Sequence, residues 1–212
     1  MKTEELIHLL AADLEPSRLR FRLRLRFELA CGAAVAAAIL FVALRVRPDL
    51  AAQIGSPRLW LKFVATLSLS VASLGLVASL ATPGAQAEPW MRALLVAPIT
   101  LLVGVLAESA ATPSSTWLPG LVGHNAAYCV TLIPLLSAAP LGCLLHVLKR
   151  GAPTQPGFAG AAAGLLAGGV GATLYALHCT DDSPFFVAFW YSLAIAAPTL
   201  VGFAVGRRLL VW

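Results

Sequence analysis

Six long stretches of this chain contain no Asp, Glu, Lys or Arg, and this feature limits the possible folds more than any other. The stretches are 29–44, 63–87, 93–107, 109–148, 151–180 and 183–206. A helix needs about 20 apolar residues to cross the hydrocarbon core of a bilayer. Charged residues make up only 12% of the chain, against about a quarter in soluble domains. The sequence therefore excludes an ordinary water-soluble globule and predicts six membrane-spanning helices.

We predict an all-α integral membrane protein, a six-transmembrane-helix bundle with short loops. Proline and glycine punctuate most gaps between the apolar runs. The runs are rich in Ala, Leu and Gly, and they do not alternate as the strands of a membrane barrel do. An N-terminal segment, residues 1–26, precedes the membrane domain, residues 27–212. The predicted spans are about 27–46, 63–82, 92–111, 126–147, 157–178 and 184–206.

The distribution of Lys and Arg predicts which way the bundle faces. Five arginines occupy alternate positions from Arg18 to Arg26, just before the first span, and most other basic residues fall on the same predicted side. Short loops rich in Lys and Arg stay in the cytoplasm, so both termini are predicted to be cytoplasmic. This topology also accounts for the net charge of +5, and we expect no direct nucleic-acid partner.

An amphipathic helix is predicted near the N-terminus. Leu6, Ile7, Leu10 and Leu14 fall on one helical face, and Pro16 is expected to end the segment. A helix this short is marginal alone in water, so its leucine face needs a cover. The acidic residues around it argue against an anionic bilayer as that cover. The sequence leaves two possibilities for what covers the leucine face: a groove in a protein partner or the chain's own bundle.

The four cysteines separate into two pairs when the spans are laid out. Cys31 and Cys143 fall toward the cytoplasmic ends of the first and fourth spans, where a free cysteine serves as a small apolar filler. Cys129 opens the fourth span and Cys179 closes the fifth. If these spans are antiparallel neighbours, both thiols lie at the outer membrane boundary. We expect this outer pair to carry the cysteine chemistry of the chain.

Two kinds of chemistry suit the outer pair. A disulfide between them would link redox state to the spacing of two helices, or would act only as a structural staple. Alternatively, a Cu, Cd or Zn ion would bind there transiently; we expect no constitutive cofactor. In the simpler interpretation, the nearby aspartates and Ser183 only cap the last helix and His124 only caps the fourth. The candidate metal ligands are Cys129, Cys179, His124, His178, Asp181 and Asp182.

A glycine pattern on the fifth span predicts close helix packing. Gly160, Gly164 and Gly168 fall on one helical face, and small residues at this spacing let a neighbouring helix approach closely. We favour packing within the chain over a homo-oligomer interface. The oligomeric state itself stays open.

Several segments of the chain resemble one protein family. They are Lys2-Thr-Glu-Glu-Leu-Ile7, Leu10-Ala-Ala-Asp13, Arg47-Pro-Asp-Leu50, Lys149-Arg-Gly-Ala-Pro153 and, most specifically, Leu174-Tyr-Ala-Leu-His-Cys-Thr-Asp-Asp-Ser-Pro184 continuing through Phe189-Trp-Tyr191. Together they resemble the NrsF-type membrane anti-sigma factors, and the resemblance runs nearly from end to end.

The resemblance implies a bacterial inner-membrane protein that restrains an extracytoplasmic-function sigma factor. It also implies that two periplasmic-side cysteines, which match Cys129 and Cys179, are required for the response to heavy-metal or oxidative stress. The approach to the first of them reads Gly123-His124-Asn125 here. The N-terminal helix, with its leucine face, is the expected contact for the sigma factor.

Two other classes of function compete with this hypothesis. A small metal or solute transporter or channel would ordinarily carry ionisable residues mid-membrane and an internal repeat, whereas Glu108 falls near an outer span end and no repeat is evident. A membrane thiol oxidoreductase would need a resolving cysteine close to each reactive one, and the chain has no CxxC pair. We expect no enzymatic activity.

Overall fold

The computed structural model describes residues 3–82, 84–151 and 153–210, and for residues 3–18 it describes the backbone alone. Within these ranges every regular element is a helix, as predicted. In chain order the elements are α1 (Thr3–Ile39), the π-helix η1 (Leu40–Leu44), α2 (Leu50–Gln53), α3 (Pro57–Leu80), α4 (Glu88–Ala93), α5 (Val96–Ala111), the 3₁₀-helix η2 (Ser114–Thr116), α6 (Trp117–Val122), α7 (Ala126–Leu148), α8 (Pro156–Ala176), α9 (Pro184–Phe186), the π-helix η3 (Val187–Tyr191) and α10 (Ser192–Leu209).

Six helical segments are long and apolar enough to cross a membrane, which confirms the predicted number for the described residues. Their ends differ from the predicted ones by several residues. The second and third begin earlier than expected, at Pro57 and Glu88, because proline is well suited to the first turn of a helix. The six segments are Leu19–Leu44, Pro57–Leu80, Glu88–Ala111, Ala126–Leu148, Pro156–Ala176 and Pro184–Leu209.

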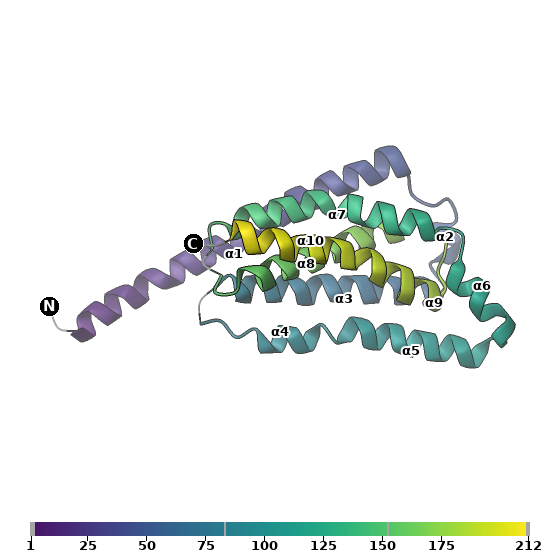
Figure 1. Ribbon diagram of the computed structural model, residues 1–212, viewed down its shortest axis with the longest axis horizontal. Helices are drawn as coiled ribbons and strands as arrows, with labels where there is room; N and C mark the ends of the chain where they lie inside the picture. The colour runs from purple at the N-terminus through teal and green to yellow at the C-terminus, as the bar shows by residue number, and fades with distance from the viewer. Residues whose placement is uncertain (1–2, 83, 152, 211–212) are drawn as a thin grey trace.

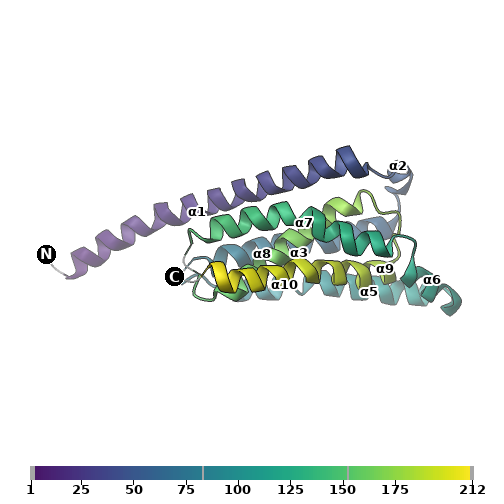
Figure 2. The same cartoon turned by 45° about the horizontal axis from the view of Figure 1, so that its top comes forward.

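The helix α8 lies at the centre of the bundle. It packs against α3, α7 and α10, and Figures 1 and 2 show these helices around it. It is the most buried of the six long segments, and its buried positions are mostly Ala and Gly. Small side chains let helix backbones approach closely, so one helix can contact three others. By contrast, α5 packs mainly on α3, and α1 packs mainly on α7, at the edge of the bundle.

The first helix is a single rod of 37 residues that η1 then extends. Figure 2 shows that the N-terminal part of α1 projects beyond the rest of the bundle. Pro16 lies within this helix, so the prediction that it ends a separate short helix is wrong. A proline inside a helix removes one backbone hydrogen bond, and the remaining bonds of a helix this long hold it together.

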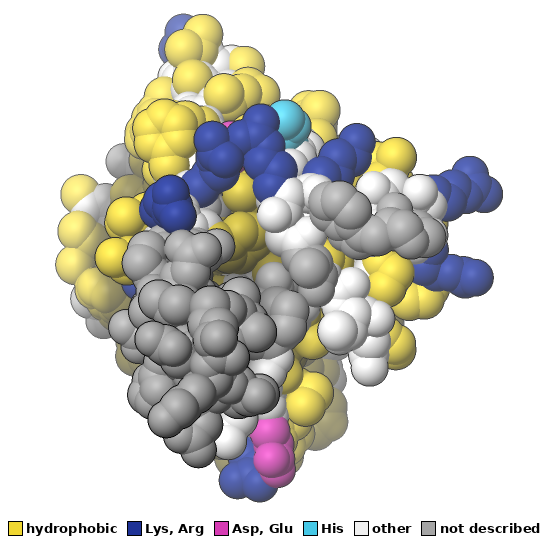
Figure 3. Space-filling view, turned by 90° about the vertical axis from the view of Figure 1, so that its left-hand side faces the viewer, with side chains coloured by type: hydrophobic (Ala, Val, Ile, Leu, Met, Phe, Trp, Pro, Cys, Tyr) yellow, Lys and Arg dark blue, Asp and Glu magenta, His cyan; other side chains and the backbone are white. Residues whose placement is uncertain are grey.

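The bundle has two ends that differ in chemistry. Figure 1 shows both ends of the chain at one end of the bundle, which we call the terminal end. Figure 3 faces this end and shows Lys and Arg side chains gathered on it. The opposite end, which we call the cysteine end, is formed by residues 45–56, 112–125 and 177–183.

Candidate functional site

Two cysteine thiols share one apolar cluster at the cysteine end. Cys129, in the first turn of α7, and Cys179, just after α8, are both fully buried and both free. Tyr175, Phe186 and Tyr191 belong to the same cluster, and the two tyrosine rings lie 6.0 Å apart between centroids. The structure therefore brings together the two cysteines that the sequence places at one level.

The thiol of Cys179 is held in its protonated form by its surroundings. Burial raises the pKa of this thiol, and the nearby positive charge of Lys62 opposes the rise without cancelling it. The sulfur atom lies 3.8 Å from the backbone carbonyl of Asp181, to which it donates. Since the thiolate is the form that binds metals and reacts with disulfides, chemistry at Cys179 requires a local opening of this cluster.

Two positively charged side chains donate hydrogen bonds to the backbone carbonyl of Cys179. The ammonium of Lys62 donates to the carbonyl oxygen of Cys179 at 3.1 Å, and the guanidinium of Arg47 donates to the same oxygen at 3.0 Å. Both cations also pair with the carboxylate of Asp182, each at 2.6 Å. Lys62 has no exposed surface. We call the side chains of Arg47, Lys62 and Asp182, with the Cys179 carbonyl, the cation clamp.

The loop that follows the first span is part of the same structure. Arg47 donates to Asp49 through both Nε and a terminal nitrogen, at 2.8 and 2.7 Å, and this pairing lowers the pKa of Asp49. The backbone nitrogen of Arg47 donates to the carbonyl of Leu177 at 3.0 Å. The Nδ1 of His178 lies 2.9 Å from the carbonyl oxygen of Arg45. The end of the first span is thus tied to the chain on both sides of Cys179.

Asp181 joins the same loop to α7. Its carboxylate accepts hydrogen bonds from the backbone nitrogens of His124 and Asn125, at 2.9 and 2.8 Å, and from the side chain of Asn125. Burial opposes ionisation of Asp181, but these hydrogen bonds outweigh it and lower its pKa. The carboxylate therefore caps the N-terminus of α7, the helix that begins three residues before Cys129.

The other candidate metal ligands do not converge with the two thiols. The side chain of His124 is 96% exposed, and both aspartates and His178 already have partners. Within the described part of the chain, no three His, Cys, Asp or Glu side chains are arranged to hold a metal ion. The metal site stays a prediction, and it would require rearrangement of this end of the bundle.

The simpler interpretation of the aspartates, as caps of the last helix, differs from the observed contacts. Asp181 caps α7, and Asp182 pairs with Arg47 and Lys62. Ser183 lies at the start of α9 but makes no capping hydrogen bond through its side chain.

Sequence reasoning missed the two cations of the clamp. The sequence-based topology places Arg47 and Lys62 in a loop, although α3 begins at Pro57 and takes Lys62 into the bundle. One signal was available, because Lys62 stands immediately before an uncharged stretch that ends only at Ala87. Its partner, Asp182, is far away in the sequence, so only the fold reveals the pair.

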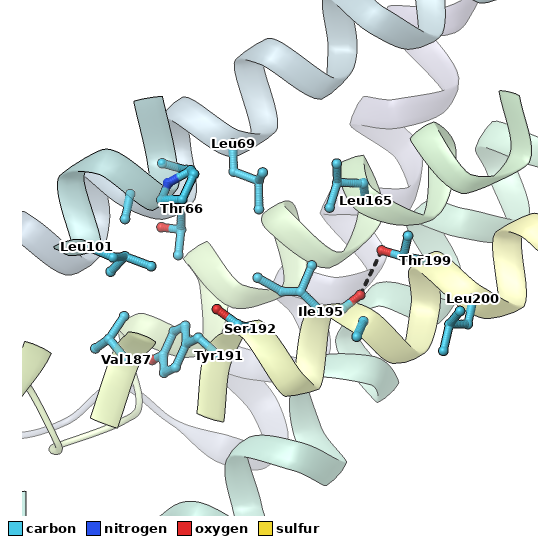
Figure 4. A pocket seen from close by; sticks show the side chains of 14 residues that line it. Thr66, Leu69, Leu101, Leu165, Val187, Tyr191, Ser192, Ile195, Thr199 and Leu200 are labelled. Atoms are coloured by element: carbon cyan, nitrogen blue, oxygen red, sulfur yellow. Dashed lines mark hydrogen bonds between the residues drawn. The ribbon is translucent and has the colours of Figure 1, made fainter. Parts of the chain in front are cut away.

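An apolar cavity of about 420 Å³ adjoins the apolar cluster that contains Cys129 and Cys179, and Tyr191 belongs to both the cavity lining and the cluster. Figure 4 shows Leu101, Leu165 and Ile195 around it. The residues that line it include no charged side chain. Its polar groups are the hydroxyls of Thr66, Tyr191, Ser192 and Thr199, and groups of this kind can orient a small ligand. Glu108, the acidic residue of α5, pairs with Arg58.

The glycine stripe of α8 faces α10 within the same chain. A Cβ atom added to Gly164 would lie 2.7 Å from the Cα of Thr199, and one added to Gly168 would lie 2.9 Å from the Ile195 side chain. Gly160 faces Gly202 and Gly206 in the same way. The stripe is therefore occupied by an intramolecular partner.

Comparison with known proteins shows full-length similarity to one family. The family profile described as "Negative regulator of sigma F" matches residues 10–212. The chain is 36% identical to the anti-sigma-F factor NrsF of Caulobacter vibrioides (strain NA1000 / CB15N), with 100% of both chains covered. It is 35% identical to the probable anti-sigma-F factor NrsF of Azospira oryzae (strain ATCC BAA-33 / DSM 13638 / PS), again with 100% of both covered. No solved structure matches the chain significantly.

Proposed function

The chain belongs to the family of negative regulators of sigma F, and from this membership we propose that it is an anti-sigma factor that holds an extracytoplasmic-function sigma factor inactive. The observation that carries the proposal is similarity over the whole chain, including all six long apolar segments. A regulator of this kind acts by binding and release, which requires two states and no catalytic group.

We further propose that the bundle spans the bacterial inner membrane with its terminal end in the cytoplasm. The gathering of basic side chains on that end supports this orientation, because cytoplasmic loops of membrane proteins are rich in Lys and Arg. In this orientation the cysteine end faces the periplasm, an oxidising compartment in which disulfides persist. The N-terminal part of α1 then extends into the cytoplasm toward the sigma factor. The proposed contact residues Leu6, Ile7, Leu10 and Leu14 have side chains outside the described residues.

The proposed sensor is the pair Cys129 and Cys179. Their burial in one cluster supports the pairing. A disulfide requires only these two sulfur atoms, whereas tetrahedral Zn²⁺ requires two further ligands, and Asp181, Asp182 and His178 already have partners. We therefore favour oxidation as the stimulus: hydrogen peroxide accepts two electrons and its O–O bond breaks, the two sulfur atoms form a disulfide, and the two thiol protons leave in the two water molecules that result. Transient binding of Cu, Cd or Zn is the alternative that the experiment separates.

The test uses a sigma-dependent reporter together with co-purification of the sigma factor. In Cys129→Ser and Cys179→Ser, we expect normal repression at rest and loss of induction by hydrogen peroxide. Cys31→Ser and Cys143→Ser are controls at thiols outside this cluster and should keep induction. If Cd²⁺ induces and peroxide does not, the stimulus is a metal.

Two outcomes would contradict the proposal. Full induction in the Cys179→Ser variant would remove the sensor role, and absence of any sigma factor from the purified resting protein would remove the anti-sigma role. Deletion of residues 1–15 tests the contact separately: we expect constitutive transcription, with the truncated protein still inserted in the membrane.

A further inference from the structure

We propose that α1 is a lever that turns movement at the Cys179 loop into a larger movement of the cytoplasmic segment. This inference rests on the proposed function, and it adds the route by which a periplasmic signal reaches the sigma factor. It assigns roles to Arg47, as the attachment of the lever, and to Gly32, as its pivot. The contacts of α1 differ at its periplasmic end, at its middle and along its cytoplasmic half.

The periplasmic end of the lever is attached to the chain around Cys179. Within the residues just after η1, Arg47 reaches the Cys179 carbonyl and Asp182, and its own backbone nitrogen binds Leu177. His178 binds the carbonyl of Arg45. These contacts lie immediately before and after the reactive residue, so Cys179 cannot swing toward Cys129 without displacing atoms that Arg47 and Arg45 hold. The end of the first span must follow or lose these bonds.

The middle of the lever rests on α7 at one point of close approach. A Cβ added to Gly32 would lie 2.6 Å from the Cα and 2.9 Å from the nitrogen of Pro140. Here backbone meets backbone, and no flexible side chain can absorb a shift. Ala36 and Leu40, in the next two turns, are also fully buried. The Gly32–Pro140 contact is therefore a natural pivot for a rigid helix.

The cytoplasmic half of the lever has open space on two sides. A cleft of about 510 Å³ is bordered by Arg24 and Phe21 of α1 and by Arg150. A second cleft, of about 290 Å³, separates Arg22 and Arg26 of α1 from Trp90 and the end of α3. Leu25 of this half packs into the apolar cluster with Leu144 and Leu148, so a swing of α1 must slide Leu25 along α7 while its arginine-bearing sides move into the two clefts.

The lengths of the two arms give the expected amplification. A helix rises about 1.5 Å per residue, so the arm from Gly32 to Leu44 is about 18 Å long and the arm from Gly32 to Thr3 is about 44 Å long. A rigid rod that pivots at Gly32 therefore moves about twice as far at its N-terminal end as at its periplasmic end. Helix shifts of about 1–2 Å are typical of signalling transitions, so the N-terminal end is expected to move by about 2–5 Å.

The experiment measures this movement in the purified full-length protein in nanodiscs. Spin labels on non-canonical amino acids at position 8 or position 19 are paired with one at position 209, so that Cys129 and Cys179 stay free to react. Diamide then oxidises the pair: two thiols become a disulfide, and the azo group takes up both hydrogens to give a hydrazine. We expect both label distances to change, and the change at position 8 to be about 1.8 times that at position 19, in the ratio of their distances from Gly32.

Two variants separate the lever from a general rearrangement. Arg47→Gln leaves the Lys62–Asp182 pair in place. The disulfide should form at least as readily, because Cys179 has lost one restraint, while both distance changes should shrink, because only the backbone bond to Leu177 and the His178–Arg45 contact still attach the lever. Gly32→Ala should alter the resting distances, because α1 must move away from Pro140. Gly142→Ala is its control on α7, since an added Cβ there meets nothing within 4 Å.

Three other outcomes would contradict the lever, the Arg47 attachment or the proposed function, respectively. If peroxide releases the sigma factor through the two cysteines but neither distance changes, the lever is wrong and the proposed function stands. If the distances change equally in Arg47→Gln, the attachment is wrong. If no disulfide forms and no sigma factor is released, the proposed function fails first.

Discussion

At the scale of single residues, the cysteine end is organised around one buried cation. Lys62 is fully buried, yet its ammonium meets both a carboxylate and a carbonyl oxygen. A buried charge is tolerated only when it is paired and hydrogen-bonded. The pairing also restrains the backbone of Cys179, because both cations donate to its carbonyl oxygen. In the proposed mechanism, this restraint passes a small chemical change at Cys179 to the residues that are bonded to it.

We predict that Lys62→Met is strongly destabilising and that Arg58→Met, on the same helix, is not. Removing one member of a buried pair costs about 3–5 kcal/mol because the partner is left uncompensated. Arg58 is half-exposed where it pairs with Glu108, and such pairs contribute about 0–1 kcal/mol. Unfolding in mixed detergent micelles measures the difference. Equal losses in the two variants would contradict the assignment of Lys62 to the clamp.

A second prediction at this scale concerns pH. Because burial raises the pKa of Cys179, the folded protein favours the thiol, while the unfolded chain ionises near the ordinary value of about 8.5. The stability that burial of the neutral thiol contributes is therefore present below about pH 8.5 and is lost as pH rises toward the folded-state pKa. Maleimide labelling of Cys179 should be slow at pH 7 in the folded protein and rise with pH, whereas the same thiol should react rapidly once the protein is denatured. Labelling at equal rates would show that Cys179 is accessible.

At the scale of elements, α7 and α8 are joined at the cysteine end by a carboxylate from a distant part of the chain. Asp181 replaces a local cap, since Asn125 makes no capping bond with its own side chain. The loop after α8 therefore fixes where α7 begins, and with it the position of Cys129. The two cysteines share one cluster partly because the residue two positions after one of them caps the helix that carries the other.

Replacing Asp181 with Ala is expected to fray the first turn of α7. Loss of an N-cap costs about 1 kcal/mol, and hydrogen exchange at residues 124–128 should accelerate. Glu88→Ala, which breaks an exposed pair within one helix, is the matched control and should leave this turn unchanged. If exchange in the turn does not respond, Asp181 does not act as the cap.

The contact between α8 and α10 supports a further prediction. Gly164→Ala places a methyl group against the backbone of Thr199, and overpacking of this kind costs about 1–3 kcal/mol. Gly142→Ala adds the same group in open space and should be neutral or slightly stabilising, because Ala favours a helix more than Gly does. Thermal unfolding of the two variants in one detergent provides the comparison.

At the scale of the whole molecule, the N-terminal part of α1 and the last turn of α10 lie at one end of the bundle, and the loop that carries Cys179 lies at the other. In the proposed orientation, alkaline phosphatase fused after residue 212 should be inactive in the cytoplasm. The same enzyme inserted in the 112–116 loop should be active in the periplasm. The reverse pattern would invert the topology and place both cysteines in the cytoplasm, where disulfides are rare.

Sequence reasoning worked where the determining interactions are local. Uncharged windows predict the six spans because each helix must satisfy the bilayer along its own length, and the order of the spans predicts that Cys129 and Cys179 share a level. It failed where the cause is distant. The burial of Lys62 depends on Asp182, and the position of the Asp181 carboxylate depends on α7. Pro16 shows that a local rule can also mislead. Proline often ends a helix, but α1 continues through Pro16.

The central position of α8 has a consequence for biosynthesis. Helices α1, α3, α5 and α7 leave the ribosome before α8, yet α3 and α7 find their main partner in it. The glycine face of α8 finds its own partner only when α10 follows. Until α8 is inserted, α3 and α7 lack their main partner, and until α10 follows, the glycine face of α8 has no cover. Messages truncated before residue 184 should therefore yield proteins that membrane proteases degrade, so that only complete chains accumulate.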